Sequence, residues 1–296
     1  MSGIIRAELM KVLRRPMTWS ALVIVLAILV TVQALLVLLA LVPTPRPVSD
    51  VQGDPGQVLI DLTVLPGGLA IGLNLLPGLG VFALAVVAAS VAGSEFTWGT
   101  VVPLLARGTD RRLVVFAKLL SLIVVMVIWT VVTVVVAALV STVASLIHLG
   151  QIPLEWLRPS VASDLGLGSL RSLLAALPYV TASVALALLF RSSAVSMAVV
   201  LGYLLAERVG LTALAALRTA VSGPLEPVLS LTDAVAIGAN ADRLTRLNTL
   251  ALSPLAEGTT IEHPCRAALL LIAYTLLFAL IAMLSLRGRD ISLRPM

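Results

Sequence analysis

The sequence predicts an all-α integral membrane protein with six transmembrane helices. Hydrophobic residues make up 59% of the 296-residue chain and charged residues only 12%, and the mean hydropathy is +1.10. The surface of a soluble domain cannot accommodate so many apolar side chains. Charges also divide the apolar sequence into six runs of about 20 residues, the length at which a helix crosses a bilayer core of about 30 Å.

The six predicted crossings differ in polarity and length. The first contains only Gln33 as a strongly polar residue, whereas the second contains Asn74, Pro77 and Gly78. The third is longer than a bilayer requires and must tilt or extend beyond it. We expect a single membrane domain over residues 1–296, with crossings at about 17–42, 69–92, 113–147, 173–190, 194–217 and 267–286.

The charges of the connecting segments predict the orientation. With the N-terminus inside, the inner segments carry twelve basic and four acidic residues, and the outer segments carry eight basic and eleven acidic ones. Because positively charged loops stay in the cytoplasm, we expect both termini there. This asymmetry explains the pI of about 10.1 without a nucleic-acid partner.

Residues 2–15 are predicted to form an amphipathic helix at the membrane interface. Ile5, Leu9, Val12 and Leu13 fall within one helical sector, and Pro16 ends the segment. A disordered basic leader is the alternative. The apolar run that follows is about twice as long as a signal-peptide core and has no small-residue cleavage site, so we expect it to be retained.

The three outer connections are predicted to differ in structure. Residues 43–68 are rich in proline and glycine and indicate an irregular polar loop. Within residues 148–169, Trp156 suits an anchor at the membrane interface. The longest connection, 222–264, contains apolar stretches at 225–231 and 234–239 that are too short to cross, and we expect re-entrant or surface-lying helices there.

The sequence argues against a nucleotide, metal or catalytic site in this chain. Its two lysines, Lys11 and Lys118, do not follow a glycine, so it has no phosphate-binding loop. The two histidines, His148 and His263, lack companions at metal-binding spacing. No pattern typical of an intramembrane protease is present, which disfavours that class of enzyme.

Glu207, Arg208 and Asn74 form a candidate intramembrane polar site. Counted from the start of the fifth crossing, Glu207 and Arg208 lie about 20 Å along the helix, where an unpaired charge costs about 3 kcal/mol. One interpretation places them in a polar cavity or against another helix. The simpler one, which we favour, is that the crossing ends early and both residues lie at the interface.

The segment between the second and third crossings, residues 93–112, has the pattern of a short cytoplasmic helix. With Thr100 as N-cap, Pro103 falls in the first turn, where its missing N–H removes no intrahelical hydrogen bond. The alternative is an ordinary solvated basic loop. Four apolar residues follow helical spacing, namely Trp98, Val101, Val102 and Leu105.

This segment, GSEFTWGTVVPLLARGTDRRLVVFAKLL, resembles the permease subunits of type-2 ABC exporters, as do the N-terminal AELMK and the six crossings. The family signature is E-x-x-x-G-T, a leucine-rich stretch, basic residues and a lysine that opens the third crossing, here Lys118. Pro103 departs from the family pattern. The resemblance implies a type V exporter fold with an N-terminal interfacial helix, a coupling helix and re-entrant helices before the last crossing. The ATPase-coupling residues that it implies are Glu95, Thr97, Trp98, Gly99, Thr100, Val101, Val102, Leu104, Leu105, Arg107, Arg111 and Arg112.

The resemblance also implies a transport subunit that is not itself an enzyme and holds no cofactor. Two ABC ATPase subunits, which bind ATP and Mg²⁺, would drive this permease together with a second copy or a related permease chain in a bacterial plasma membrane. Scarce intramembrane charge suits outward transport of an amphiphilic or lipophilic substrate, such as a drug, a peptide antibiotic or a lipid-like molecule. The alternatives are a permease that does mechanical or maturation work on an extracytoplasmic partner, and an intramembrane enzyme.

Replacing Val101 and Leu105 with Asp should weaken co-purification of the ATPase and uncouple transport. The reason is that the apolar face of the predicted helix, Thr97 to Arg107, would have to bury charge in the groove of its partner. Unchanged co-purification and transport would contradict this assignment.

Overall fold

The computed structural model describes residues 2–42, 55–99, 111–154, 158–220, 231–232, 234–253 and 263–287. Every regular element in these ranges is helical, which confirms the predicted class. Six helical elements are long and apolar enough to span a membrane, so the chain is a multi-pass membrane protein.

Each predicted crossing has a helical counterpart. The second is interrupted in the middle by a short π-helical turn, η1, where Pro77 lacks the N–H that a regular helix would use. In chain order the elements are α1 (Ser2–Leu13), α2 (Pro16–Leu41), α3 (Pro55–Thr63), α4 (Gly67–Leu75), η1 (Leu76–Gly80), α5 (Val81–Thr97), α7 (Arg111–Leu149), α8 (Pro159–Phe190), α9 (Ser193–Ala220), α11 (Ile237–Leu252) and α12 (Pro264–Arg287).

Several helices extend into segments that the sequence predicts as loops. α8 begins at Pro159, well before the predicted crossing at 173, because proline fits the first turn of a helix without losing a hydrogen bond. The predicted irregular loop at 43–68 contains α3, and α5 continues beyond residue 92 to Thr97. Trp156 lies outside the described residues.

The short helix before the last crossing lies later than predicted. The apolar stretch at 234–239 meets only the start of α11, which then runs through a polar sequence to Leu252. α11 has 16 residues, a length of about 24 Å, which is too short to cross. The stretch at 225–230 lies outside the described residues.

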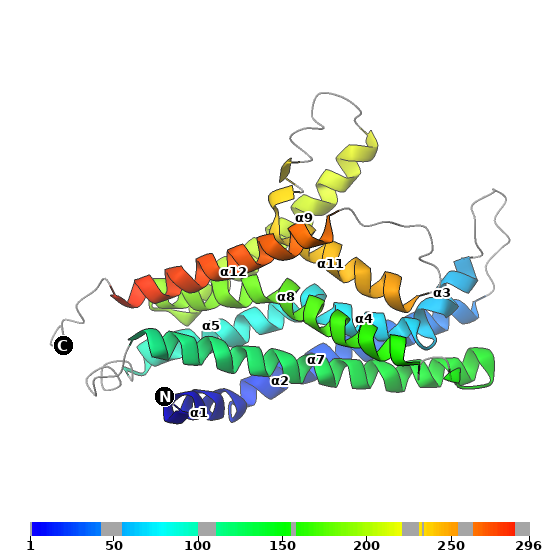
Figure 1. Cartoon of the computed structure of the whole chain (residues 1–296), viewed down its shortest axis with the longest axis horizontal. Coiled ribbons are helices and arrows are strands. Elements are labelled where there is room, and N and C mark those ends of the chain that lie inside the picture. Colours follow the sequence, from blue (N-terminus) through cyan, green and yellow to red (C-terminus); the bar gives the residue numbers. More distant parts are fainter. Residues whose placement is uncertain are drawn as a thin grey trace.

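Two of the spanning elements form the centre of the bundle. In α4–η1–α5 and in α8, more than 60% of the residues in the apolar stretch that could span a membrane are buried, against a third or less in the other four spanning elements. Figure 1 shows the long helices side by side, with α1 and the end of α12 toward one end and α3 toward the other. The last turns of α9 point away from the remaining helices (Figure 1). The described ends of α1 and α12 therefore share one side, as an even number of crossings requires.

Small residues allow the second and third spanning elements to approach closely. A Cβ atom added at Gly72 of α4 would lie 2.6 Å from the Cβ of Ala137 and 3.0 Å from the carbonyl oxygen of Thr133, both in α7. One turn earlier, a Cβ at Gly68 would overlap the side chain of Ser141. This G-x-x-x-G face brings the backbones into van der Waals contact, which is the main source of helix association in a bilayer.

Gly72→Ala should destabilise the protein, because overpacking of a tight interface costs about 1–3 kcal/mol. Gly202→Ala is the matched control, since a Cβ at this position in α9 meets nothing within 4 Å. We expect a lower thermal unfolding temperature in detergent for the first variant and an unchanged or higher one for the second. Equal stability of the two variants would contradict the α4–α7 contact.

Candidate functional site

α1 lies against α7 and turns one polar side chain inward. Val12 is fully buried and Leu9 is partly buried, as the predicted apolar sector requires, but Glu8, at the edge of this sector, is also buried. The outer side of the helix carries the exposed residues Arg6 and Lys11. The structure therefore confirms an amphipathic helix, and its place at a membrane interface stays a prediction.

Glu8 belongs to a network of four charges that joins three helices. The Lys118 ammonium of α7 lies 3.0 Å from Glu8 Oε2 and 2.6 Å from Oε1 of Glu95, in the last turn of α5. Lys11 completes the network, 2.6 Å from Glu8 Oε1 and 3.1 Å from Glu95 Oε1. The two positive and two negative charges balance, and the chain has no other lysine.

The charges of the network depend on their partners, because three of its members are buried. The side chains of Lys118 and Glu8 are 2% and 3% exposed and that of Glu95 is 10% exposed, whereas that of Lys11 is 46% exposed. Burial alone would raise the pKa of Glu8, but the charges and hydrogen bonds of Lys118 and Lys11 outweigh it and hold that pKa below its ordinary value. Burial would likewise lower the pKa of Lys11, yet its bonds to the two glutamates raise it.

Arg15, in the elbow between α1 and α2, adds a second connection to the end of α5. Its guanidinium donates hydrogen bonds to the hydroxyls of Ser90, at 3.2 Å, and Ser94, at 2.7 Å. It also lies over the ring of Trp98, 5.7 Å from the centroid, a cation–π contact. Ser90 and Ser94 lie on one face of the last two turns of α5, and Trp98 is its C-cap residue. The elbow between α1 and α2 therefore fixes the direction in which the chain leaves the helix.

The predicted coupling helix does not begin at Thr97. Thr97 is the last residue of α5, and Gly99 then adopts a positive φ of 65° that ends the helix. Trp98, which the sequence places on the apolar stripe of the predicted helix, is 71% exposed in this chain. Arg111 is the first residue of α7 and Arg112 is exposed. The other predicted coupling residues lie outside the described part of the chain: Thr100, Val101, Val102, Leu104, Leu105 and Arg107.

Sequence reasoning missed the roles of Glu8, Lys11 and Arg15. A signal for Glu8 was present, because it occupies the apolar sector at i+3 from Ile5, where a carboxylate needs a buried partner. The partner was less evident, since Lys118 is 110 residues away along the chain.

Glu207, Arg208 and Asn74 belong to a second polar cluster, centred on α11. α9 continues to Ala220, well past both charged residues, so the helix itself does not end there. Whether the crossing ends before them stays a prediction. Glu207 and Arg208 contact other helices, Glu207 through the hydroxyl of Tyr179 and Arg208 through Asp242, at 3.1 Å. Their depth in the bilayer stays a prediction.

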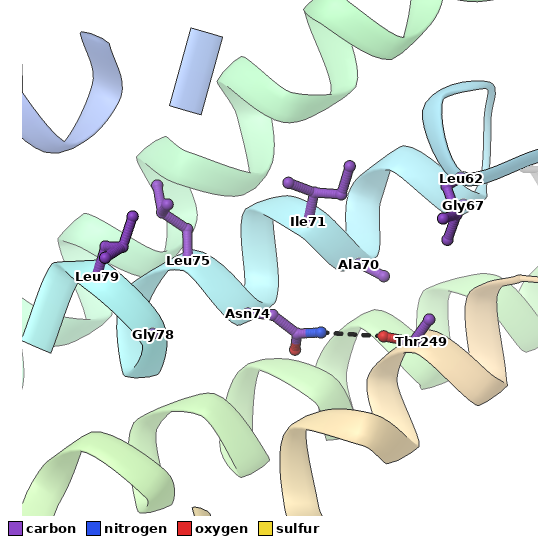
Figure 2. A pocket seen from close by; sticks show the side chains of 9 residues that line it. All are labelled: Leu62, Gly67, Ala70, Ile71, Asn74, Leu75, Gly78, Leu79 and Thr249. Atoms are coloured by element: carbon purple, nitrogen blue, oxygen red, sulfur yellow. Dashed lines mark hydrogen bonds between the residues drawn. The ribbon is translucent and has the colours of Figure 1, made fainter. Parts of the chain in front are cut away.

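Asn74 lies in the wall of a pocket of about 280 Å³ that α3, α4, η1 and α11 form. Its amide donates a hydrogen bond to the Thr249 hydroxyl at 3.1 Å and accepts one from Asn248 at 3.0 Å. Figure 2 shows the bond between Asn74 and Thr249, with the apolar side chains of Ile71, Leu75 and Leu79 on the opposite side of the ribbon. The pocket suits an apolar ligand or chain segment with one neutral polar group, because no charged residue lines it.

Comparison with known proteins places this arrangement in a family. The family described as "Protein of unknown function (DUF2705)" matches residues 68–292. The chain belongs to this family. The DUF2705 match covers Glu95, Lys118 and the α11 cluster, while Glu8, Lys11 and Arg15 precede it. A search of curated proteins found no match. Among the described residues, no group of three or more His, Cys, Asp or Glu side chains could hold a metal ion.

Lys118→Met should destabilise the protein strongly, by about 3–5 kcal/mol, because Glu8 and Glu95 would lose their buried cation. Lys11→Met is the matched control, with the same change and the same two partners at an exposed position, and should cost about 1 kcal/mol or less. Unfolding in detergent measures both. A loss for Lys118→Met no larger than that for Lys11→Met would contradict the buried network.

Proposed function

We propose that this chain is the membrane-spanning permease subunit of an ATP-driven exporter of the ABC class, powered by separate ATPase subunits. The observation that carries the proposal is the four-charge network of Glu8, Lys11, Glu95 and Lys118. It joins the N-terminal helix to both ends of the segment between the second and third crossings. That segment is where the resemblance to type-2 ABC exporters predicts contact with the ATPase.

The geometry supports transmission of movement from this segment into the membrane. The chain enters it from the last turn of α5, which Arg15 and the network hold, and leaves it into α7, seven residues before Lys118. A force applied between these points would displace the ends of α5 and α7, together with α1, because their charges are costly to separate. A flexible attachment would dissipate the same force.

The pocket beside Asn74 supports an amphiphilic or lipophilic substrate. Its lining is apolar except for Asn74 and Thr249, so it offers no counter-charge to an ion. The proposed direction is outward, with both termini in the cytoplasm of a bacterial cell, where the basic segments are retained.

Arg15→Met should reduce substrate-stimulated ATP hydrolysis roughly two- to thirty-fold, the range in which residues between two sites change their coupling. The measurement uses the chain in lipid nanodiscs with co-expressed ABC ATPase subunits. The ATPase should still co-purify, because Arg15 holds the end of α5 without forming part of the predicted coupling helix.

Arg14→Met is the control, since Arg14 is the neighbouring exposed arginine and should leave stimulation unchanged. Failure of the unmodified chain to associate with any ABC ATPase would overturn the proposed function. Equal stimulation of the Arg15→Met and unmodified complexes would overturn the role of the elbow.

A further inference from the structure

α11 receives its N-terminal cap from another helix. Its own N-cap residue, Ala236, has no side chain that could bond the free N–H groups of the first turn. Glu207 of α9 supplies the acceptor, with Oε1 2.8 Å from the N–H of Gly238. A carboxylate at this position satisfies a free donor and interacts favourably with the positive end of the helix dipole. The hydroxyls of Tyr179 and Tyr203 donate to the same carboxylate and hold it in place.

The next residue, Arg208, connects α11 to the π-helical turn of the second crossing. One guanidinium nitrogen lies 3.1 Å from Asp242 Oδ1 of α11, and the other donates to the carbonyl oxygen of Pro77, also at 3.1 Å. Two consecutive residues of α9 therefore bind the start of α11 and the interruption in α4–η1–α5. We call this pair, Glu207 and Arg208, the clasp.

The far end of α11 is held by polar contacts as well. Asn248 and Thr249 both bond Asn74 of α4, and Asn248 also donates to the hydroxyl of Ser172 in α8. Thr249 is the residue that α11 contributes to the pocket wall, and Gly78, next to Pro77, lines the same pocket. The wall between α11 and the second crossing thus combines a few hydrogen bonds, some of them at the clasp, with apolar packing in which Leu252 of α11 shares a buried cluster with Leu69 and Leu73 of α4.

We propose that α11 is a movable gate on this pocket and that the clasp holds the gate closed. Hydrogen bonds between helices inside a bilayer are individually weak, about 1 kcal/mol, and can be exchanged for others as helices shift. The second crossing carries Glu95 at one end and both contact points, Asn74 and Pro77, near its middle. A displacement of α5 would therefore act on the gate through η1. The passage of a substrate through the gate rests on the proposed function, but the holding of α11 by the clasp does not.

Hydrogen–deuterium exchange of the whole chain in nanodiscs tests the clasp without any transport assay. Glu207→Ala and Arg208→Met should each accelerate amide exchange in α11 about two- to thirty-fold, the range for loss of a helix cap. Exchange in α12 should remain unchanged, which separates gate opening from general unfolding. Leu205→Ala, at a 57% exposed position of the same helix, is the control and should change neither. Unchanged exchange in α11 in both clasp variants would overturn the proposal.

A disulfide tests whether the gate must move during transport. Leu211→Cys and Gly238→Cys, in a Cys265→Ser background that removes the exposed native thiol, would join α9 to α11 beside the clasp, where a Cβ at Gly238 would lie 2.9 Å from the Leu211 side chain. Neither position lines the pocket. The oxidised complex should keep its ATPase subunits and lose transport, and reduction should restore it. Equal transport by the oxidised and reduced complexes would overturn the gate. Absence of bound ATPase in the unmodified complex would instead overturn the proposed function, leaving the exchange result to decide the role of the clasp.

Discussion

Two glutamates and two lysines form ion pairs where α1, α5 and α7 meet, and the arrangement of this end of the bundle depends on that pairing. A charge that leaves water without a partner costs several kcal/mol, so each member of the network restricts where its helix can lie. Lys118 and Glu95 fix the ends of α5 and α7 relative to each other, and Glu8 then orients α1 across both. Packing of apolar side chains alone would permit rotation or sliding that the four charges do not.

The helices in the middle of the bundle are held together by other kinds of contact. Between α4 and α7, glycine and small residues let the backbones approach closely. Around α11, hydroxyls, amides and one ion pair bridge the helices, and Leu252 adds apolar packing against α4. The interface between α4 and α7 therefore resists rearrangement, because its backbones are in close contact. The hydrogen bonds around α11 can be exchanged one at a time.

The six crossings could be predicted from sequence because a long apolar run has few alternatives to a spanning helix. The ends of the helices were harder to predict, as α8 shows, because residues 159–172 form helix although their sequence is too polar to stand out as part of a crossing. α11 was harder still. Its polar residues, such as Asp242 and Asn248, resemble those of a loop until their partners on α4, α8 and α9 are known. Glu207, Arg208 and Asn74 were identified as polar residues out of place, but pairs separated by up to 175 residues leave no local pattern.

The charges of the N-terminal network divide into two neutral pairs. Within α1, Glu8 and Lys11 lie three residues apart and neutralise each other, and Lys118 and Glu95 do the same between α7 and α5. The family match begins at Gly68 and contains only the second pair. α1 thus brings its own counter-ion to the network, and the pair of Lys118 and Glu95 stays matched between α7 and α5 whether or not α1 is in place. Within this network the N-terminal helix is a neutral addition to a pair that the two longer helices form without it.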